Sequence, residues 1–369
     1  MVQKMKNEIG SFYESVPMTG DRNDADTVFD LLGRIPGFTP YFFSCGRQPI
    51  GAVADDIEAN LHGPKTCMLP SYTCDTVIIP FTDRGWDVTF YGVNTDLTVD
   101  DAFISLCESV KPSVLLMHTY YGCDTIANVR DRIGKWQKER GLIFIEDMTQ
   151  SLFLLDDIAP TADYYVGSLR KWFPIPDGGF ALSSTPLDVA YNGEYTEYIE
   201  TKTSAQKMKY DYLTGVRDEK DEVLRLNRRS EDLLYEEDRF HDMSKISYDM
   251  LKITDIGSIA SKRNRNAAVL IDGIDRLRDI RSLIHIDTEA PLYVPVITSD
   301  RDKLQKHLRE YDIFAPVLWP VPKECEDTMS DDVRTVFNDM LASPCDQRYD
   351  EEDMHRILSC LESYDNGVR

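Results

Sequence analysis

Between residues 41 and 185 the sequence repeatedly alternates short apolar runs with longer segments in which apolar residues recur at helical spacing. The runs at residues 66–69, 113–117 and 142–145 are apolar at nearly every position. Strands of that kind are buried on both faces, and strands that alternate with helices pair in parallel. The pattern therefore predicts an α/β fold with a mainly parallel sheet covered by helices on both faces.

The alternation places each expected element. Strands of the sheet are expected at residues 41–44, 66–69, 87–91, 113–117, 142–145, 162–166 and 180–183. Helices are expected between them at residues 50–61, 76–82, 102–110 and 128–140. Charged helical stretches follow within residues 186–240 and 253–283. The remainder predicts a small α+β region with strands at 291–297 and 314–319 and helices at 300–311 and 351–364.

The chain is long enough for one large domain and an appended smaller one. Residues 1–40 are polar and interrupted by Gly and Pro, which predicts an N-terminal arm with one short helix at residues 26–32. We expect a large domain over residues 41–255 and a small C-terminal domain over residues 256–369.

Charge and cysteine usage exclude several classes of protein. A net charge of −23 argues against partners such as nucleic acid or anionic membranes, which reward clustered Lys and Arg. The eight cysteines form no C-x-x-C pair and no zinc-binding spacing with His, so no metal site is expected. The start of the chain is polar and charged, and no run reaches transmembrane length. A reducing cytoplasm is the expected location.

One lysine lies in an unusual connection, residues 167–180, between two expected strands. Pro174 and Pro176 prevent a helix from continuing there, and two glycines follow them. Three apolar residues flank Lys171 closely: Leu169, Trp172 and Phe173. An amine held among apolar side chains can act as a nucleophile, whereas a surface lysine would only lay its stem along the aromatic rings.

Other reactive side chains are expected near Lys171. Ligands of open α/β sheets bind outside the carboxyl ends of the strands, and expected strands run into His118, Asp147 and Ser168. A buried carboxylate such as Asp147 needs a cation or strong donor, for example a protonated pyridine nitrogen. The start of the helix after Gly46 offers free N–H groups to a phosphate. Together these groups favour pyridoxal 5′-phosphate as cofactor, although Asp147 could instead cap a helix or pair with an arginine.

Four segments in order resemble the DegT/DnrJ/EryC1/StrS family of pyridoxal-phosphate-dependent aminotransferases. They are Gly46-Arg47, Leu69-Pro70-Ser71-Tyr72-Thr73-x-x-Thr76, Glu146-Asp147-Met148-Thr149-Gln150-Ser151, and Ser168-Leu169-Arg170-Lys171 followed by Gly178-Gly179. The resemblance covers residues 40–185 and extends loosely to the C-terminal region. It implies fold type I, a large domain with a small C-terminal domain, and a homodimer with active sites at the interface.

The resemblance also implies roles for individual residues. Lys171 is expected to form the Schiff base with the cofactor and then to transfer protons, and Asp147 to keep the ring nitrogen protonated. Gln150 is expected beside the phenolic oxygen of the cofactor. Phosphate-binding positions match Ser168, Gly46 and Arg47. Taken without the resemblance, these last residues could equally cap strands or start a helix.

The sequence departs from the family at three places. Cys74 occupies the position where the family has a large aromatic residue over the cofactor ring, so Cys74 and Tyr72 are both candidates to contact it. No asparagine occurs in residues 247–256, where the family has a phosphate-binding segment of the partner subunit. His118 begins a His-x-aromatic-Gly motif with one extra residue and is either a site residue or a packed strand-end histidine.

The leading hypothesis is an aminotransferase that moves an amino group from an amino acid, for example glutamate, to a small keto acceptor such as a keto-sugar nucleotide. The same fold also serves lyases and dehydratases and allows a non-catalytic cofactor-binding protein. A nucleotide-binding protein of Rossmann type is disfavoured, because neither G-x-G-x-x-G after a strand nor a P-loop occurs.

Overall fold

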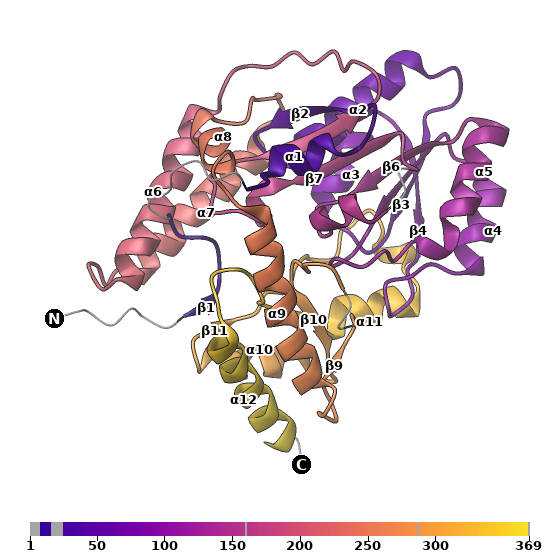
Figure 1. Cartoon of the computed structure of the whole chain (residues 1–369). Coiled ribbons are helices and arrows are strands. Elements are labelled where there is room, and N and C mark those ends of the chain that lie inside the picture. The colour runs from indigo at the N-terminus through magenta and orange to yellow at the C-terminus, as the bar shows by residue number, and fades with distance from the viewer. Residues whose placement is uncertain (1–7, 16–24, 159–160, 286–287, 368–369) are drawn as a thin grey trace.

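The computed structural model describes residues 8–15, 25–158, 161–285 and 288–367. A seven-stranded sheet with the order β2-β8-β7-β6-β5-β3-β4 lies at the centre of the larger part (Figure 1). β8 is antiparallel to both of its neighbours, and the other strands run in parallel. The strands are β2 (Thr39–Phe43), β3 (Thr66–Pro70), β4 (Asp87–Tyr91), β5 (Val114–His118), β6 (Ile143–Asp147), β7 (Tyr164–Ser168) and β8 (Gly179–Ser183).

Both faces of this sheet are buried, as the apolar strands predict. Alternate residues of β5 point to opposite faces, so Leu115 and Met117 pack in one core and Val114 and Leu116 in another. Helices α4 (Asp101–Val110) and α5 (Arg130–Arg140) contribute to the first core. Helices α2 (Arg47–Asn60) and α3 (Asp75–Thr82) contribute to the second. The mainly parallel α/β fold is therefore confirmed.

The second half of the chain adds long helices and a small sheet. The helices are α6 (Thr196–Leu213), α7 (Lys220–Glu236), α8 (Lys245–Leu251), α9 (Ile256–Ile274), α10 (Arg301–Arg309), α11 (Asp331–Asp339) and α12 (Glu351–Gly367). The three-stranded antiparallel sheet has the order β12-β10-β9, formed by Met340–Ser343, Val294–Ile297 and Arg281–Ser282. Figure 1 shows this sheet with α9 to α12 below the large sheet. The predicted domain division at residue 255 coincides with the N-cap of α9 and stays a prediction.

The predicted N-terminal arm is partly built into the fold. β1 (Ile9–Gly10) pairs in parallel with β11 (Ile313–Phe314), and β2 already starts at Thr39. α1 (Val28–Gly33) lies close to the helix predicted at residues 26–32. Residues 1–7 and 16–24 of this arm lie outside the described residues.

The strand expected at residues 314–319 was wrong in extent. β11 ends at Phe314, because Pro316 has no N–H to donate to a neighbouring strand. The sequence pattern also missed α11 and β12, which follow each other directly at Asp339 and Met340.

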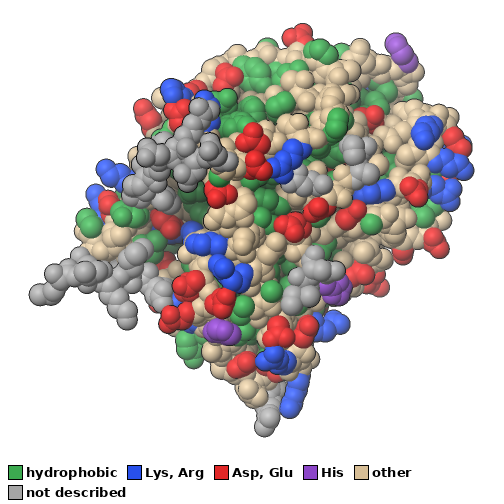
Figure 2. All heavy atoms as spheres, in the orientation of Figure 1, with side chains coloured by type: hydrophobic (Ala, Val, Ile, Leu, Met, Phe, Trp, Pro, Cys, Tyr) green, Lys and Arg blue, Asp and Glu red, His purple; other side chains and the backbone are tan. Residues whose placement is uncertain are grey.

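The outer surface carries charges of both signs. Figure 2 shows acidic side chains interspersed with basic ones over the described part of this face, rather than a basic patch. No helix in the described ranges combines the length and apolar character that crossing a membrane requires.

Asp177 anchors the connection that contains Lys171. Its carboxylate is fully buried and accepts hydrogen bonds from the backbone N–H and the hydroxyl of Ser244, at 2.8 and 2.5 Å, and from the hydroxyl of Ser247. Both serines belong to the start of α8. Burial raises the pKa of Asp177 to about 6, and the hydrogen bonds from the serines oppose this rise only in part.

We predict that Asp177 makes the folded state less stable as the pH rises from about 4 to about 6. Its folded-state pKa lies above the ordinary value of 3.8, so the protonated form is favoured in the folded state and its contribution is lost as the group ionises. The Asp177→Asn variant should lack this dependence. The difference in unfolding free energy between wild type and variant should change by roughly 3 kcal/mol over this range. Denaturant unfolding at pH 4, 5, 6 and 7 measures it, and a constant difference would contradict the prediction.

Candidate active site

A cavity of about 200 Å³ opens at the carboxyl ends of β5, β6 and β7. Its wall brings together segments that are far apart in the sequence, from Cys45 before α2 to Trp319 in the C-terminal part of the chain. Seven of the eight residues predicted from the sequence line it: Gly46, Arg47, Cys74, Asp147, Gln150, Ser168 and Lys171. His118 also lines it, and Tyr72 does not belong to this wall.

Asp147 is the buried acid of the cavity, with 3% of its surface exposed. One carboxylate oxygen lies 3.2 Å from Nδ1 of His118, and the other accepts the backbone N–H of Thr149 at 2.8 Å. Burial raises the pKa of Asp147, but the charge of His118 and the hydrogen bonds from His118 and Thr149 outweigh it and hold this pKa below its usual value. Asp147 is therefore an anion aimed at the cavity.

His118 is a positioning residue for that anion. Its ring joins Asp147 through Nδ1, and its Nε2 lies 2.8 Å from the hydroxyl oxygen of Thr73. Asp147 and His118 are the last residues of β6 and β5, and Thr73 lies just beyond β3, so the contacts tie neighbouring strand ends together. The sequence left open whether His118 is a site residue or a packed histidine, and its geometry combines both.

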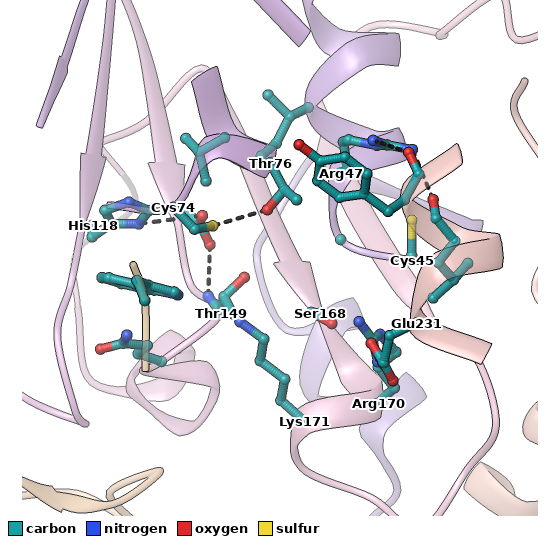
Figure 3. Close-up of a pocket in the computed structure, with 18 residues that line it drawn as sticks. Cys45, Arg47, Cys74, Thr76, His118, Thr149, Ser168, Arg170, Lys171 and Glu231 are labelled. Carbon is teal, nitrogen blue, oxygen red and sulfur yellow. Dashed lines mark hydrogen bonds and ion pairs between the residues drawn. The ribbon is translucent and has the colours of Figure 1, made fainter. Parts of the chain in front are cut away.

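Lys171 ends a short 3-10 turn, Leu169–Lys171, directly after β7. Leu169, Trp172 and Phe173 are completely buried, and the indole N–H of Trp172 donates to the carbonyl of Thr149 at 2.9 Å. Figure 3 shows the side chain of Lys171 extending from this turn toward Thr149. The apolar neighbours thus face the core and fix the backbone, while the amine reaches into the cavity.

Three segments meet at one end of the cavity with almost no space between them. A methyl group on Gly46 would lie 2.9 Å from Cβ of Ser168, and one on Gly179 would lie 2.3 Å from the carbonyl oxygen of Cys45. Glycine is therefore required at both positions. The close approach sets the hydroxyl of Ser168 beside the first turn of α2, whose N–H groups have no partner within the helix.

The guanidinium of Arg47 binds the end of a neighbouring helix. It donates to the carbonyl oxygens of Leu234, Tyr235 and Glu237 and so caps the C-terminal end of α7. Only the backbone of Arg47 therefore remains for a phosphate. Arg170, to which sequence reasoning assigned no role in the site, also lines the cavity and pairs with Glu231 at 3.0 Å.

Tyr72 and Cys74 have different surroundings. The ring of Tyr72 is buried against Tyr120, Trp319 and Phe337, and its hydroxyl contacts Tyr121, so its expected contact with a cofactor is not supported. Cys74 lines the cavity and lies 2.9 Å from the hydroxyl of Thr76 (Figure 3). Burial raises the pKa of the Cys74 thiol, so it remains a neutral, weakly polar wall.

Sequence reasoning also missed residues of the wall that come from the second half of the chain, and three of them carry polar or aromatic side chains. They are Glu231 and Tyr235 on α7, and Trp319 in the loop after β11. The ring of Trp319 lies 5.0 Å from that of Tyr72 and 6.0 Å from that of His118. No pattern near these residues points to a site, because only the tertiary fold brings them to it. Among the described residues, no group of three or more His, Cys, Asp or Glu could hold a metal ion.

Comparison with known proteins identifies the fold. No protein-family model matches the sequence, and no curated protein matches it at the sequence level. Solved structures match across nearly the whole chain. PseC of Helicobacter pylori, an aminotransferase of pseudoaminic acid biosynthesis, is 10% identical with a TM-score of 0.66, covering 98% of this chain and 100% of PseC. The sugar aminotransferase CalS13 of Micromonospora echinospora is 14% identical with a TM-score of 0.64 over 92% of each chain.

A third match is a DegT DnrJ EryC1 StrS aminotransferase of Brucella abortus. It is 15% identical with a TM-score of 0.62, and the match covers 90% of this chain and 88% of that one. The protein therefore has the fold of these aminotransferases, fold type I of the pyridoxal-phosphate-dependent enzymes, as the sequence resemblance predicts.

The residues present fit pyridoxal phosphate. The side-chain oxygen of Gln150 is buried in the wall without a hydrogen-bond partner among the described residues, so this oxygen is available to a ligand. Ser168 and the start of α2 offer donors to a phosphate, Asp147 an anion to a ring nitrogen, and Lys171 an amine.

We predict that Gly46→Ala weakens the binding of pyridoxal phosphate. The added methyl group must displace Ser168 from the start of α2, which separates the two groups expected to hold the phosphate. Losing one charge-assisted hydrogen bond corresponds to an increase in Kd of about tenfold or more. Titration of the cofactor-free protein followed by absorbance measures it. Gly33→Ala is the matched control, since its methyl group meets no atom within 4 Å, and equal losses in both variants would contradict the prediction.

Proposed function

We propose that the protein is a pyridoxal-phosphate-dependent aminotransferase of the DegT/DnrJ/EryC1/StrS type. The observation that carries this proposal is the convergence of Lys171 and Asp147 on one cavity beside Ser168 and the start of α2. Each of these groups taken alone could have a purely structural role. Together they provide a Schiff-base amine, a pyridinium partner and a phosphate-binding site.

The bound cofactor would supply an electron sink that stabilises negative charge on the substrate carbon. Asp147 favours that sink, because an anion held by His118 and Thr149 stabilises a protonated ring nitrogen. Gln150 orients the phenolic side of the ring with its amide. Lys171 would hold the cofactor through its amine, and the same amine would take a proton from the substrate carbon and pass it on.

The amino donor is an amino acid and the acceptor a small carbonyl compound. Several structures of the same fold are sugar aminotransferases by name, which supports a keto sugar as acceptor. The donor and the acceptor exchange at one cavity, because the same residues serve both half-reactions. Lyase or dehydratase chemistry on the same residues is the alternative, and it differs in its products.

We predict that glutamate converts the bound cofactor to pyridoxamine phosphate with release of 2-oxoglutarate. Absorbance of the protein and chromatography of the released cofactor follow the conversion in a single half-reaction. Lys171→Ala should slow it by roughly 10²- to 10⁴-fold, the usual contribution of a positioned acid–base group.

The exposed lysine of α6 gives a matched control, because Lys207→Ala removes the same groups far from the cavity wall. Its rate should equal that of the wild type. Release of an elimination product from a screened amino acid, without formation of pyridoxamine phosphate, would reject transamination.

Trp319 would supply the aromatic wall that Cys74 does not. Its ring lines the cavity from the C-terminal part of the chain, next to His118 and Tyr72. Aromatic stacking contributes about 0.5–1.5 kcal/mol beyond burial, which is enough to compensate for a small residue at position 74.

We predict that Trp319→Leu raises the Kd of pyridoxal phosphate by roughly 2- to 12-fold, through the loss of that stacking energy. Trp319→Phe retains an aromatic face and should stay close to wild type. Absorbance titration of the cofactor-free variants measures both constants. Unchanged affinity in Trp319→Leu would show that this ring does not cover the cofactor.

The resemblance implies a homodimer, and the surface of α8 is consistent with it. Ile246, Tyr248 and the nearby Ile253 are each more than a third exposed. They lie in the region where the family places its partner-subunit segment. We propose that this segment contacts the second subunit, and sedimentation analysis at increasing concentration tests it.

A further inference from the structure

A second cavity of about 160 Å³ adjoins the first behind Lys171. Arg170, Lys171 and Glu231 line both cavities, so a molecule in the second cavity shares these three residues with the first. The other walls come from α6, α9 and the segment after β1, where Ser11, Phe12 and Tyr13 cover one side.

The second cavity is strongly cationic in a protein whose net charge is −23. Five cationic side chains line it: Arg170, Lys171, Lys202, Arg263 and Arg348. Glu231 and Asp346 are the two anions of the wall, which leaves an excess of three positive charges. Directly behind the wall, Lys209 and Glu14 add one charge of each sign, so the excess persists.

Such an excess is costly because these groups are shielded from water. Arg263 is completely buried, and only 5% of the surface of Lys202 is exposed. Arg263 donates to Gln347, to two backbone carbonyls and to the hydroxyl of Tyr13, all of them neutral acceptors. Buried charges normally meet counter-ions, so an anionic ligand would stabilise this arrangement.

Two cations of the wall, Arg170 and Lys202, are arranged so that they could bind such a ligand. Glu231 bridges Arg170 at 3.0 Å and Lys202 at 2.7 Å, so a single carboxylate is shared by two cations. Nε of Arg170 is buried and has no hydrogen-bond partner among the described residues. The guanidinium thus has an unused donor, whereas those of Arg263 and Arg348 are engaged by their neighbours.

We propose that the second cavity binds a carboxylate group of the amino donor, with Lys202 and Arg170 as the recognising cations. This inference rests on the proposed aminotransferase function for the identity of the ligand. A cavity of about 160 Å³ has room for a small acid. The position supports a donor, because its amine would then face Lys171.

Glutarate is the probe, since it carries two carboxylates and has no amine that could react. Calorimetric titration of the cofactor-loaded wild type should show binding. Lys202→Gln should weaken it by about tenfold or more, because a charge-assisted contact is lost. Lys202→Arg should bind glutarate more tightly than Lys202→Gln, since the positive charge remains.

Glu231→Gln should change the affinity for glutarate in the opposite direction from Lys202→Gln. It removes the carboxylate that competes with the ligand, so glutarate should bind several-fold more tightly. Lys207→Gln, the same charge change on the exposed face of α6, should leave the affinity unchanged. Lys202→Gln should also keep the cofactor affinity of the wild type, because Lys202 does not belong to the wall of the first cavity.

Equal glutarate affinity in wild type and Lys202→Gln, or no binding to wild type, would overturn the proposal. Inorganic phosphate that displaces glutarate at equal concentration would overturn the carboxylate assignment. The two proposals fail separately. Absence of the glutamate half-reaction alongside Lys202-dependent glutarate binding rejects only the aminotransferase function, whereas a normal half-reaction with unchanged Lys202→Gln rejects only the donor site.

Discussion

The burial of Asp147 at the end of β6 is the constraint on which the geometry of the site depends. A carboxylate that is 97% shielded from water destabilises the fold unless it is fully hydrogen-bonded, and His118 and Thr149 meet that need. His118 is in turn held by Thr73, so the ends of β3, β5 and β6 are joined by one chain of contacts. The parallel register of β6 and β7 then fixes where Lys171 emerges relative to the acid.

Most of the large sheet follows from local patterns because each strand is apolar on both faces. β4 was predicted at its observed bounds, and β5 and β6 differ from prediction by one or two residues at their ends. The C-terminal region was predicted less well, since its short strands depend on partners far away in sequence. β11 pairs with β1, more than 300 residues earlier, and no periodicity within residues 313–314 reveals that contact.

The same distinction applies to the site. Residues that follow strand ends, such as Asp147 and Ser168, were predictable because parallel strands deliver their carboxyl ends to one edge. Arg47 was assigned to a phosphate by position, but α7 ends beside it and its open carbonyl groups take the guanidinium. Trp319 was missed because nothing in its own neighbourhood distinguishes it from a loop residue. Its role depends on packing between the two halves of the chain.

The N-terminal segment connects these features to function. β1 pairs with β11, and the residues that follow it close the second cavity, where Phe12 lies 5.3 Å from the Lys202 amine and Tyr13 contacts Arg263. The segment therefore shields cations that would otherwise be solvated. This raises the free-energy cost of burying them and also strengthens their attraction for an anion. A site of this kind gains affinity from the surplus charge that the fold already stabilises. The cationic wall thus contrasts with the net charge of −23 of the whole chain, and this contrast favours a small anion at the second cavity.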